Sequence, residues 1–252
     1  MKSLALLLAL SSIVTAQNAI TFPKDGGVLD VRDYGAKSDD AGDDTAAIQK
    51  ALDAFPNGNR IIYLPAGTWI VSDTLRWPGG KHGGEAQKRT ILQGAGRSLT
   101  RLRLPDSTPG FADEKTKALI WTGGSPAQRF RNAVRDLTIE VGKGNPGAIG
   151  LQFNASNQGC IRDVTIRTAE GSGSIGLDMG FTNEIGPLLV RGLEVEGFET
   201  GISTKWPVNS NTFEHVRVRG QRKFGWHNYH QMVFVRDLVS ENAVTAIYNE
   251  KD

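Results

Sequence analysis

Two side chains that can transfer protons stand at equivalent places in a motif that recurs along this chain of 252 residues. Asp178 follows Gly176 by two positions, and His227 follows Gly225 by two positions. Carboxyl and imidazole groups are frequent general acids and bases. Because equal spacing after a repeated glycine predicts equal places in a repeated structure, we interpret Asp178 and His227 as the candidate catalytic residues.

Polar and aromatic side chains occupy the same place in the neighbouring copies of this motif. If Ile149 and Leu151 point inward from a strand, alternation turns Gln152 outward. Aromatic rings stack on the apolar faces of sugars, while polar groups bond to sugar hydroxyls, so such a column predicts a carbohydrate-binding surface. The candidate substrate-binding residues are Gln152, Ser203, Lys205, Trp206, Trp226, Tyr229 and Tyr248.

The spacing of stacked strands limits what this column can catalyse. Neighbouring coils would place equivalent residues about 4.8 Å apart, and coils two apart about 9.6 Å. Glycosidases hold two carboxyl groups about 5–5.5 Å or about 6.5–9.5 Å apart, whereas this column holds one carboxylate, Asp178, with His227 two coils away. A lyase would use a basic side chain instead, for which Lys205 is the nearest candidate. The sequence predicts no metal site and no cofactor.

Two short motifs alternate along the C-terminal half. The first has an apolar-x-x-apolar-x-apolar pattern and begins at residues 134, 161, 190, 213 and 235. The second is centred on Gly150, Gly176, Gly201, Gly225 and Ala246. Such a period predicts a solenoid. Two strands per period, no room for a helix and a variable period favour an all-β right-handed parallel β-helix over a leucine-rich repeat, which would require Asn or Cys where this chain has Gly142, Ala169, Phe198 and Gln221.

A second column of polar residues belongs to the first motif. Its members are Asp136, Asp163, Gly192, His215 and Asp237, four of them preceded by arginine. Stacked carboxylates repel unless each is hydrogen-bonded or paired with a positive charge. We interpret these Asp residues as turn-forming groups that bond backbone N–H groups, with the arginines neutralising the stack.

The N-terminal part predicts a leader and one helix. Lys2, the apolar run over residues 4–13 and the small residues before position 17 are typical of a secretory signal peptide over residues 1–16. From Asp43 to Phe55 the apolar residues Ile48, Ala51, Leu52 and Phe55 have helical spacing. We therefore expect a segment with a capping helix over residues 17–60 and the β-helix over residues 61–252.

Charge and composition exclude several classes of protein. The chain has 29 Lys and Arg against 27 Asp and Glu, so its net charge of +2 gives no reason to expect a nucleic-acid partner. Its one cysteine, Cys160, cannot form an internal disulfide. No apolar run reaches the roughly 20 residues of a membrane-spanning helix. We expect a secreted protein, extracellular or periplasmic, with no membrane attachment after signal cleavage.

Specific stretches resemble the pectate-lyase-like β-helix superfamily, which includes rhamnogalacturonase-like and polygalacturonase-like proteins and two-domain β-1,3-glucanases. The N-terminal stretches are residues 30–37, residues 43–45 and residues 62–69; residues 184–190 and 197–202 are most similar to the glucanase branch. The resemblance covers nearly the whole mature chain and implies that the helix caps the N-terminal end of the coil stack. The polygalacturonase-like Gly-His-Gly and Arg-Ile-Lys motifs are absent. Residues 225–228, which read Gly-Trp-His-Asn, are only loosely similar to the first motif.

These features lead us to expect a polysaccharide substrate and no specific protein partner. A glycoside hydrolase acting on β-glucan or on a pectin-type polymer is the first hypothesis, with a neutral glucan favoured because basic residues are scattered beside the column. A polysaccharide lyase and a non-catalytic binding module or adhesin are the alternatives. The last strand motif ends close to Asp252, so we also expect a β-helix truncated at its C-terminal end, inactive as this fragment.

Overall fold

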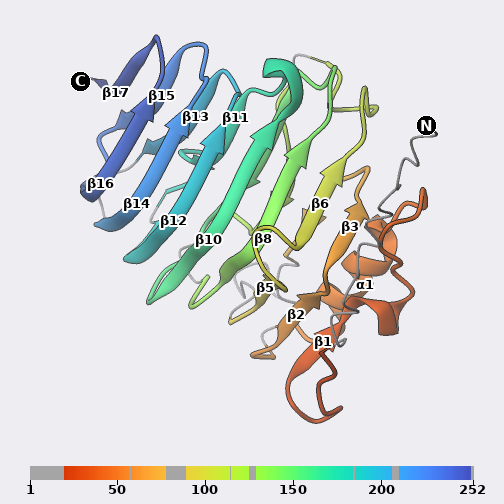
Figure 1. Cartoon of the computed structure of the whole chain (residues 1–252). Helices are drawn as coiled ribbons and strands as arrows, with labels where there is room; N and C mark the ends of the chain where they lie inside the picture. The colour runs from red at the N-terminus through yellow and green to blue at the C-terminus, as the bar shows by residue number, and fades with distance from the viewer. Residues whose placement is uncertain are drawn as a thin grey trace, which may run out of the picture.

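A parallel β-helix accounts for almost all of the residues that the structure describes. The computed structural model describes residues 20–56, 58–77, 89–113, 115–124, 129–183, 185–205 and 210–250. Successive coils stack from the N-terminal helix to the C-terminal strands (Figure 1). All of the strand pairs are parallel, and each long strand pairs with a strand about one coil away in sequence. The β-helix predicted from the two alternating motifs is therefore confirmed.

Two sheets form the walls of the solenoid. Sheet A contains β1 (Val28–Asp30), β2 (Ile61–Leu64), β3 (Gly67–Ile70), β5 (Ile91–Gly94), β6 (Thr100–Leu104), β8 (Ala133–Val141), β10 (Gly159–Thr168), β12 (Leu188–Glu196), β14 (Asn211–Arg219) and β16 (Val233–Glu241). Sheet B contains β4 (Leu75–Arg76), β7 (Lys117–Trp121), β9 (Ala148–Gln152), β11 (Ile175–Met179), β13 (Thr200–Lys205), β15 (Phe224–Tyr229) and β17 (Thr245–Glu250). Two short 3-10 helices, η1 (Val31–Tyr34) and η2 (Ala169–Gly171), lie at turns.

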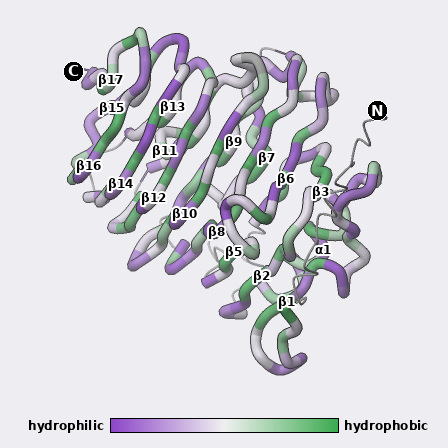
Figure 2. Tube along the Cα trace, viewed as in Figure 1, coloured by the Kyte–Doolittle hydropathy of each residue, from purple (hydrophilic) through white to green (hydrophobic). Residues whose placement is uncertain are grey.

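Apolar side chains from both sheets fill the interior. Hydrophobic and hydrophilic residues alternate along the strands (Figure 2), as strands with one buried face require. Equivalent residues stack from coil to coil, for example Leu137, Val164, Leu193 and Val216, all fully or almost fully buried. Each coil thus adds one equivalent apolar layer to the core.

A bend in the left-handed backbone region explains the polar column of the first motif. Asp136, Asp163, Gly192, His215 and Asp237 all have φ between 52° and 66°. Gly, Asn, Asp and His are the residues that adopt this region most readily, so the column is selected by backbone geometry. The predicted structural role is supported, but these side chains bond other side chains: Arg162 donates to Asp136 over 3.2 Å, and His215 Nδ1 lies 2.6 Å from Asp237 Oδ2.

We predict that Asp163→Val destabilises the protein by about 1–2 kcal/mol, the usual cost of a left-handed conformation, because Asp adopts this region readily whereas β-branched residues rarely do. The φ of Asp163 is 52° and its side chain is 55% exposed, so loss of packing contributes little. Asp163→Gly is the matched control, since the next coil has Gly192 at this position with φ 66°. Urea unfolding of both variants measures the effect, and equal losses for valine and glycine would contradict it.

The N-terminal helix α1 spans Thr45–Ala54 and buries Ile48, Ala51 and Leu52. The helix and its buried face are confirmed, except that Phe55 is wrong: it follows the last helical residue and is 46% exposed. The Arg60 guanidinium lies over the Phe55 ring, 5.0 Å from its centre. Asp43 bonds the Thr45 N–H at the helix start.

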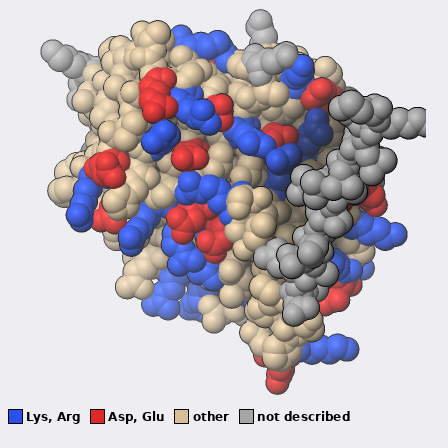
Figure 3. All heavy atoms as spheres, in the orientation of Figure 1, with Lys and Arg blue, Asp and Glu red and all other residues tan. Residues whose placement is uncertain are grey.

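The outward face of sheet A carries alternating charges, and Figure 3 shows acidic and basic side chains interspersed over the viewed face. Glu140 receives hydrogen bonds from Arg167, and Arg219 donates to Glu196 over 2.8 Å. Because these charges neutralise one another, this face has no strong net field. Within the described residues, no helix is long and apolar enough to cross a membrane.

Candidate functional site

The strands of sheet B align the predicted site residues in one column on the outer face. Asp178 pairs in register with Gln152 on one side and with Ser203 on the other. Ser203 pairs with His227, and His227 with Tyr248. The alignment predicted from the glycine motif is confirmed, and the column continues toward the N-terminus through Trp121 and Arg76.

Asp178 lies in the middle of this column but is only 5% exposed. Its carboxylate accepts hydrogen bonds from Gln152 Nε2 over 2.9 Å and from the Gly180 N–H over 2.8 Å, and it is bonded to the Ser203 side chain. Burial raises the pKa of Asp178 and outweighs these bonds. A carboxyl group in this setting keeps its proton at higher pH and is suited to donate it.

We predict that ionisation of Asp178 weakens the fold as pH rises. The folded pKa lies above the ordinary value of 3.8, so the unfolded chain releases this proton first. The free energy of unfolding therefore loses a contribution as pH rises from the unfolded toward the folded pKa. Urea unfolding of the wild type and of Asp178→Asn between about pH 4 and pH 8 measures this, with the variant gaining relative stability at higher pH. A pH-independent difference would contradict the prediction.

His227 lies in an aromatic cluster on the last described coils. Its Nε2 lies 2.7 Å from Glu250 Oε2, and its ring centre lies 5.2 Å from Phe224 and 5.5 Å from Tyr248. Phe224 and Tyr248 stack with ring centres 4.7 Å apart. The sequence-based prediction missed Phe224 and Glu250. Glu250 could have been found, because it stands two residues after Tyr248 and therefore on the same face.

A second outward column runs beside the first. Lys205 pairs in register with Tyr229, which pairs with Glu250. The Lys205 Nζ lies 4.8 Å from the centre of the Tyr229 ring. The structure thus brings Lys205 and Tyr229 to the same face as Asp178 and His227.

Trp226 is a correction, because it lies inside the coil. It is 1% exposed, donates a hydrogen bond from Nε1 to Thr204 Oγ1 over 2.8 Å, and contacts Phe213. It pairs in register with Ile202, another buried residue. Trp226 therefore builds the core and cannot contact a substrate on the surface. Trp206 lies outside the described residues.

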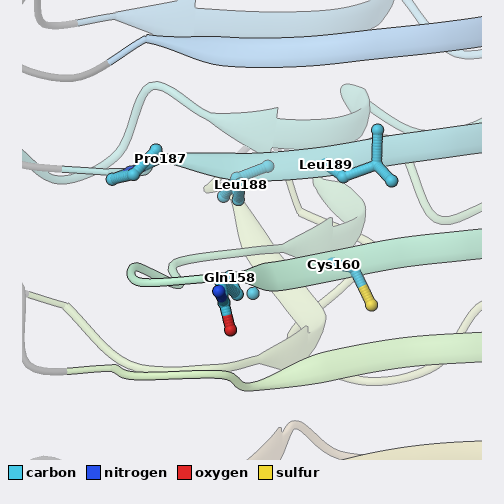
Figure 4. Close-up of a pocket in the computed structure, with 6 residues that line it drawn as sticks. Gln158, Cys160, Pro187, Leu188 and Leu189 are labelled. Atoms are coloured by element: carbon cyan, nitrogen blue, oxygen red, sulfur yellow. The ribbon is translucent and has the colours of Figure 1, made fainter.

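A hollow of about 370 Å³ on sheet A offers no comparable chemistry (Figure 4). Its lining is Gln158, Gly159, Cys160, Pro187, Leu188 and Leu189. None of these residues is charged, and burial raises the pKa of the Cys160 thiol. In the part of the chain that the structure describes, no cluster of three or more His, Cys, Asp or Glu residues is arranged to hold a metal ion.

The described column therefore combines groups that can transfer protons with aromatic rings. The strands that carry Asp178 and Glu250 are three strand steps, or roughly 14 Å, apart. Glycosidases hold their two carboxyl groups about 5–5.5 Å or about 6.5–9.5 Å apart. Asp178 and His227 are two steps apart and differ in kind, one a buried carboxyl and the other a half-buried imidazole. The arrangement suits an acid and a base acting at different atoms.

Comparisons with known proteins agree with this architecture. The mannuronan C5-epimerase AlgE5 of Azotobacter vinelandii is 32% identical over 149 residues, which cover 56% of this chain and 14% of the epimerase. The non-secreted LysM effector LysM19 of Penicillium expansum is 39% identical over 153 residues, covering 59% of this chain and 11% of the effector. This chain thus spans less than a fifth of either curated relative.

A solved structure shows the same fold. The A-module of the mannuronan C-5 epimerase AlgE6 of Azotobacter vinelandii superposes with a TM-score of 0.64 at 20% identity, over 86% of this chain and 57% of the module. The family model described as rhamnogalacturonase A/epimerase, pectate lyase-like matches residues 28–252. With nine-tenths of its length matched and the β-helix in place, this chain belongs to the rhamnogalacturonase A/epimerase, pectate lyase-like family.

Proposed function

We propose that this chain binds a polysaccharide across the outer face of sheet B and modifies it by proton transfer at Asp178 and His227. The observation that carries the proposal is the alignment of a buried carboxyl, an imidazole and aromatic rings in one outward column. A polysaccharide is long enough to contact several coils at once, as such a column requires.

The reaction class that fits this geometry is proton abstraction beside a sugar carboxylate. His227 takes a proton from the carbon next to the carboxylate. In elimination, the electron pair of that C–H bond forms a carbon–carbon double bond, the bond to the glycosidic oxygen breaks, and Asp178 protonates that oxygen. In epimerisation, the glycosidic bond stays intact and Asp178 donates a proton to the same carbon from the opposite side of the sugar ring. Lys205, on the same face, supports the negative charge that develops near the carboxylate.

Two observations favour this class over the hydrolase expected from the sequence. The strand that carries Glu250, the second carboxyl group on this face, lies three strand steps, or roughly 14 Å, from the strand of Asp178, farther than the carboxyl separation in glycosidases. The epimerases to which the chain is similar bear names that refer to mannuronan. The substrate proposed is accordingly an acidic polysaccharide, in place of the neutral glucan expected from the sequence.

Product analysis tests the proposal. The protein is incubated with mannuronan, polygalacturonate and a neutral β-glucan, and the ultraviolet absorbance of unsaturated uronates, the release of reducing ends and the proton NMR spectrum are recorded. New unsaturated ends or a changed uronate epimer support the proposal. Reducing ends without unsaturation would show hydrolysis, and binding without any product would show a non-catalytic module; both would overturn it.

We also propose that the protein acts outside the cytoplasm, on the basis of the apolar run and small residues over residues 1–16. These residues lie outside those that the structure describes. Expression of the full chain and N-terminal sequencing of the exported protein test this, with cleavage after Ala16 expected. Retention of the intact chain in the cytoplasm would contradict it.

A further inference from the structure

One buried cation, Arg129, forms no ion pair with a carboxylate of the described residues. Arg129 is 5% exposed, and its Nε and Nη1 atoms have no hydrogen-bond partner. Burial lowers its pKa to about 10, so the guanidinium remains charged at neutral pH. A buried charge normally has a partner, because an uncompensated one is costly. Arg129 therefore has two nitrogen atoms, Nε and Nη1, for which the described residues supply no acceptor.

Arg129 lies over the N-terminal part of the outward column. Its guanidinium carbon is 5.9 Å from the centre of the Trp121 ring, and Arg76 lies 5.7 Å from the same ring. Trp121 pairs in register with Gln152, which donates a hydrogen bond to Asp178. Trp121, over whose ring Arg129 lies, is thus two strand steps, or roughly 9.6 Å along the stack, from Asp178.

The backbone makes room for this guanidinium. Gly123 has φ of 104°, and a Cβ at this position would lie about 2.0 Å from the Arg129 guanidinium carbon. Any other residue at position 123 would displace Arg129 from the Trp121 ring. Because Gly123 has no side chain, the Arg129 guanidinium has room to lie against the Trp121 ring.

Other arginines on the molecule contrast with Arg129. Arg167 donates to Glu140, and Arg219 donates to Glu196. Those arginines lie on the outward face of sheet A, and their acceptors are carboxylates of this protein. The ring contact attracts Arg129 through its positive charge, but it supplies no acceptor for Nε and Nη1. The N–H groups of a guanidinium lie in one plane and match a carboxylate in geometry.

We propose that Arg129 and Trp121 form a carboxylate-binding subsite for an acidic sugar, two coils from Asp178. The guanidinium bonds the sugar carboxylate while the Trp121 ring lies against the sugar face. This inference rests on the proposed function, because it takes the ligand to be an acidic polysaccharide. It adds an anchor that fixes which sugar unit reaches Asp178.

Calorimetric binding tests the subsite. The probes are a mannuronate hexasaccharide and its carboxyl-reduced counterpart, which has the same linkage and no charge. Arg129→Met is expected to weaken binding of the mannuronate by at least tenfold, as loss of a charge-assisted hydrogen bond predicts, and to leave the neutral hexasaccharide unchanged. Arg60→Met is the matched control, since Arg60 also lies over an aromatic ring, 5.0 Å from Phe55, but at the N-terminal cap.

The outcomes separate this inference from the proposed function. If the wild type binds neither hexasaccharide, the proposed function fails. If the wild type binds the mannuronate and Arg129→Met binds it equally well, the subsite is wrong and the proposed function stands. Circular dichroism establishes that the variant is folded. If Arg129→Met does not fold, Arg129→Lys decides, because lysine keeps the charge and loses the planar donor pair; unchanged affinity in that variant would overturn the subsite.

Discussion

Replacing Asp178 by asparagine is expected to slow conversion of an acidic polysaccharide by about 10²–10⁴-fold, the usual contribution of a positioned general acid or base. Asparagine has nearly the same shape and can still accept the bond from the Gly180 N–H. It cannot give up a proton to the glycosidic oxygen. Binding of the mannuronate hexasaccharide should therefore change little, while the initial rate at saturating substrate falls.

Arg191→Gln is the control for this experiment. Arg191 lies on the outer face of sheet A, its side chain is 56% exposed, and its ion pair with Glu214 is 3.9 Å long. This variant changes a side chain outside the sheet B column and should retain the full rate. An Asp178→Asn variant with the activity of the wild type would exclude Asp178 as the proton donor.

Replacing Gly176 by valine is expected to cost about 3 kcal/mol of stability or more, at the upper end of what overpacking costs. A Cβ at this position would lie 2.3 Å from Val195 Cγ1 and 2.8 Å from the Gly201 carbonyl oxygen. The second contact is with backbone, which cannot turn aside as a side chain does. Chemical denaturation of the purified variant measures the loss, provided that it folds at all.

The same contact recurs along the stack, so the effect should recur as well. A Cβ on Gly201 would lie 2.5 Å from the Gly225 oxygen, and a Cβ on Gly225 would lie 2.6 Å from the Ala246 oxygen. Ala246, in the last described coil, already carries a methyl group there. Ala246→Gly is thus the matched control, with an expected change below about 1 kcal/mol. Equal effects at positions 176 and 246 would contradict the close approach.

The glycine motif predicted much of the fold and the site alignment because each glycine is imposed by the next coil. The close approach between each glycine and a carbonyl oxygen of the next coil fixes how the coils stack. The residues two positions after these glycines therefore lie in one column. Asp178 and His227 were found in this way. The polar column of the first motif was predictable for a related reason. Its members, such as Asp136 and Gly192, share one backbone requirement, a positive φ of 60° and 66°.

Other features depend on contacts that spacing does not encode. Trp226 precedes His227 directly, so alternation places it inside, yet its residue type suggested a sugar-binding ring. The hydrogen bonds that Asp178 forms with Gln152 and Ser203 come from neighbouring coils. Arg129 belongs to neither repeated motif. Only the folded chain shows that it lies over Trp121 and that its Nε and Nη1 have no acceptor among the described residues.

The most direct test of the central claim is a crystal structure of the Asp178→Asn variant with a bound mannuronate hexasaccharide. The sugar chain is expected to cross the outer face of sheet B from Trp121 to His227, with one carboxylate on Arg129 and a glycosidic oxygen near residue 178. A sugar chain bound to the charged outward face of sheet A, around Glu140 and Arg167, with no sugar on the sheet B column, would contradict the claim.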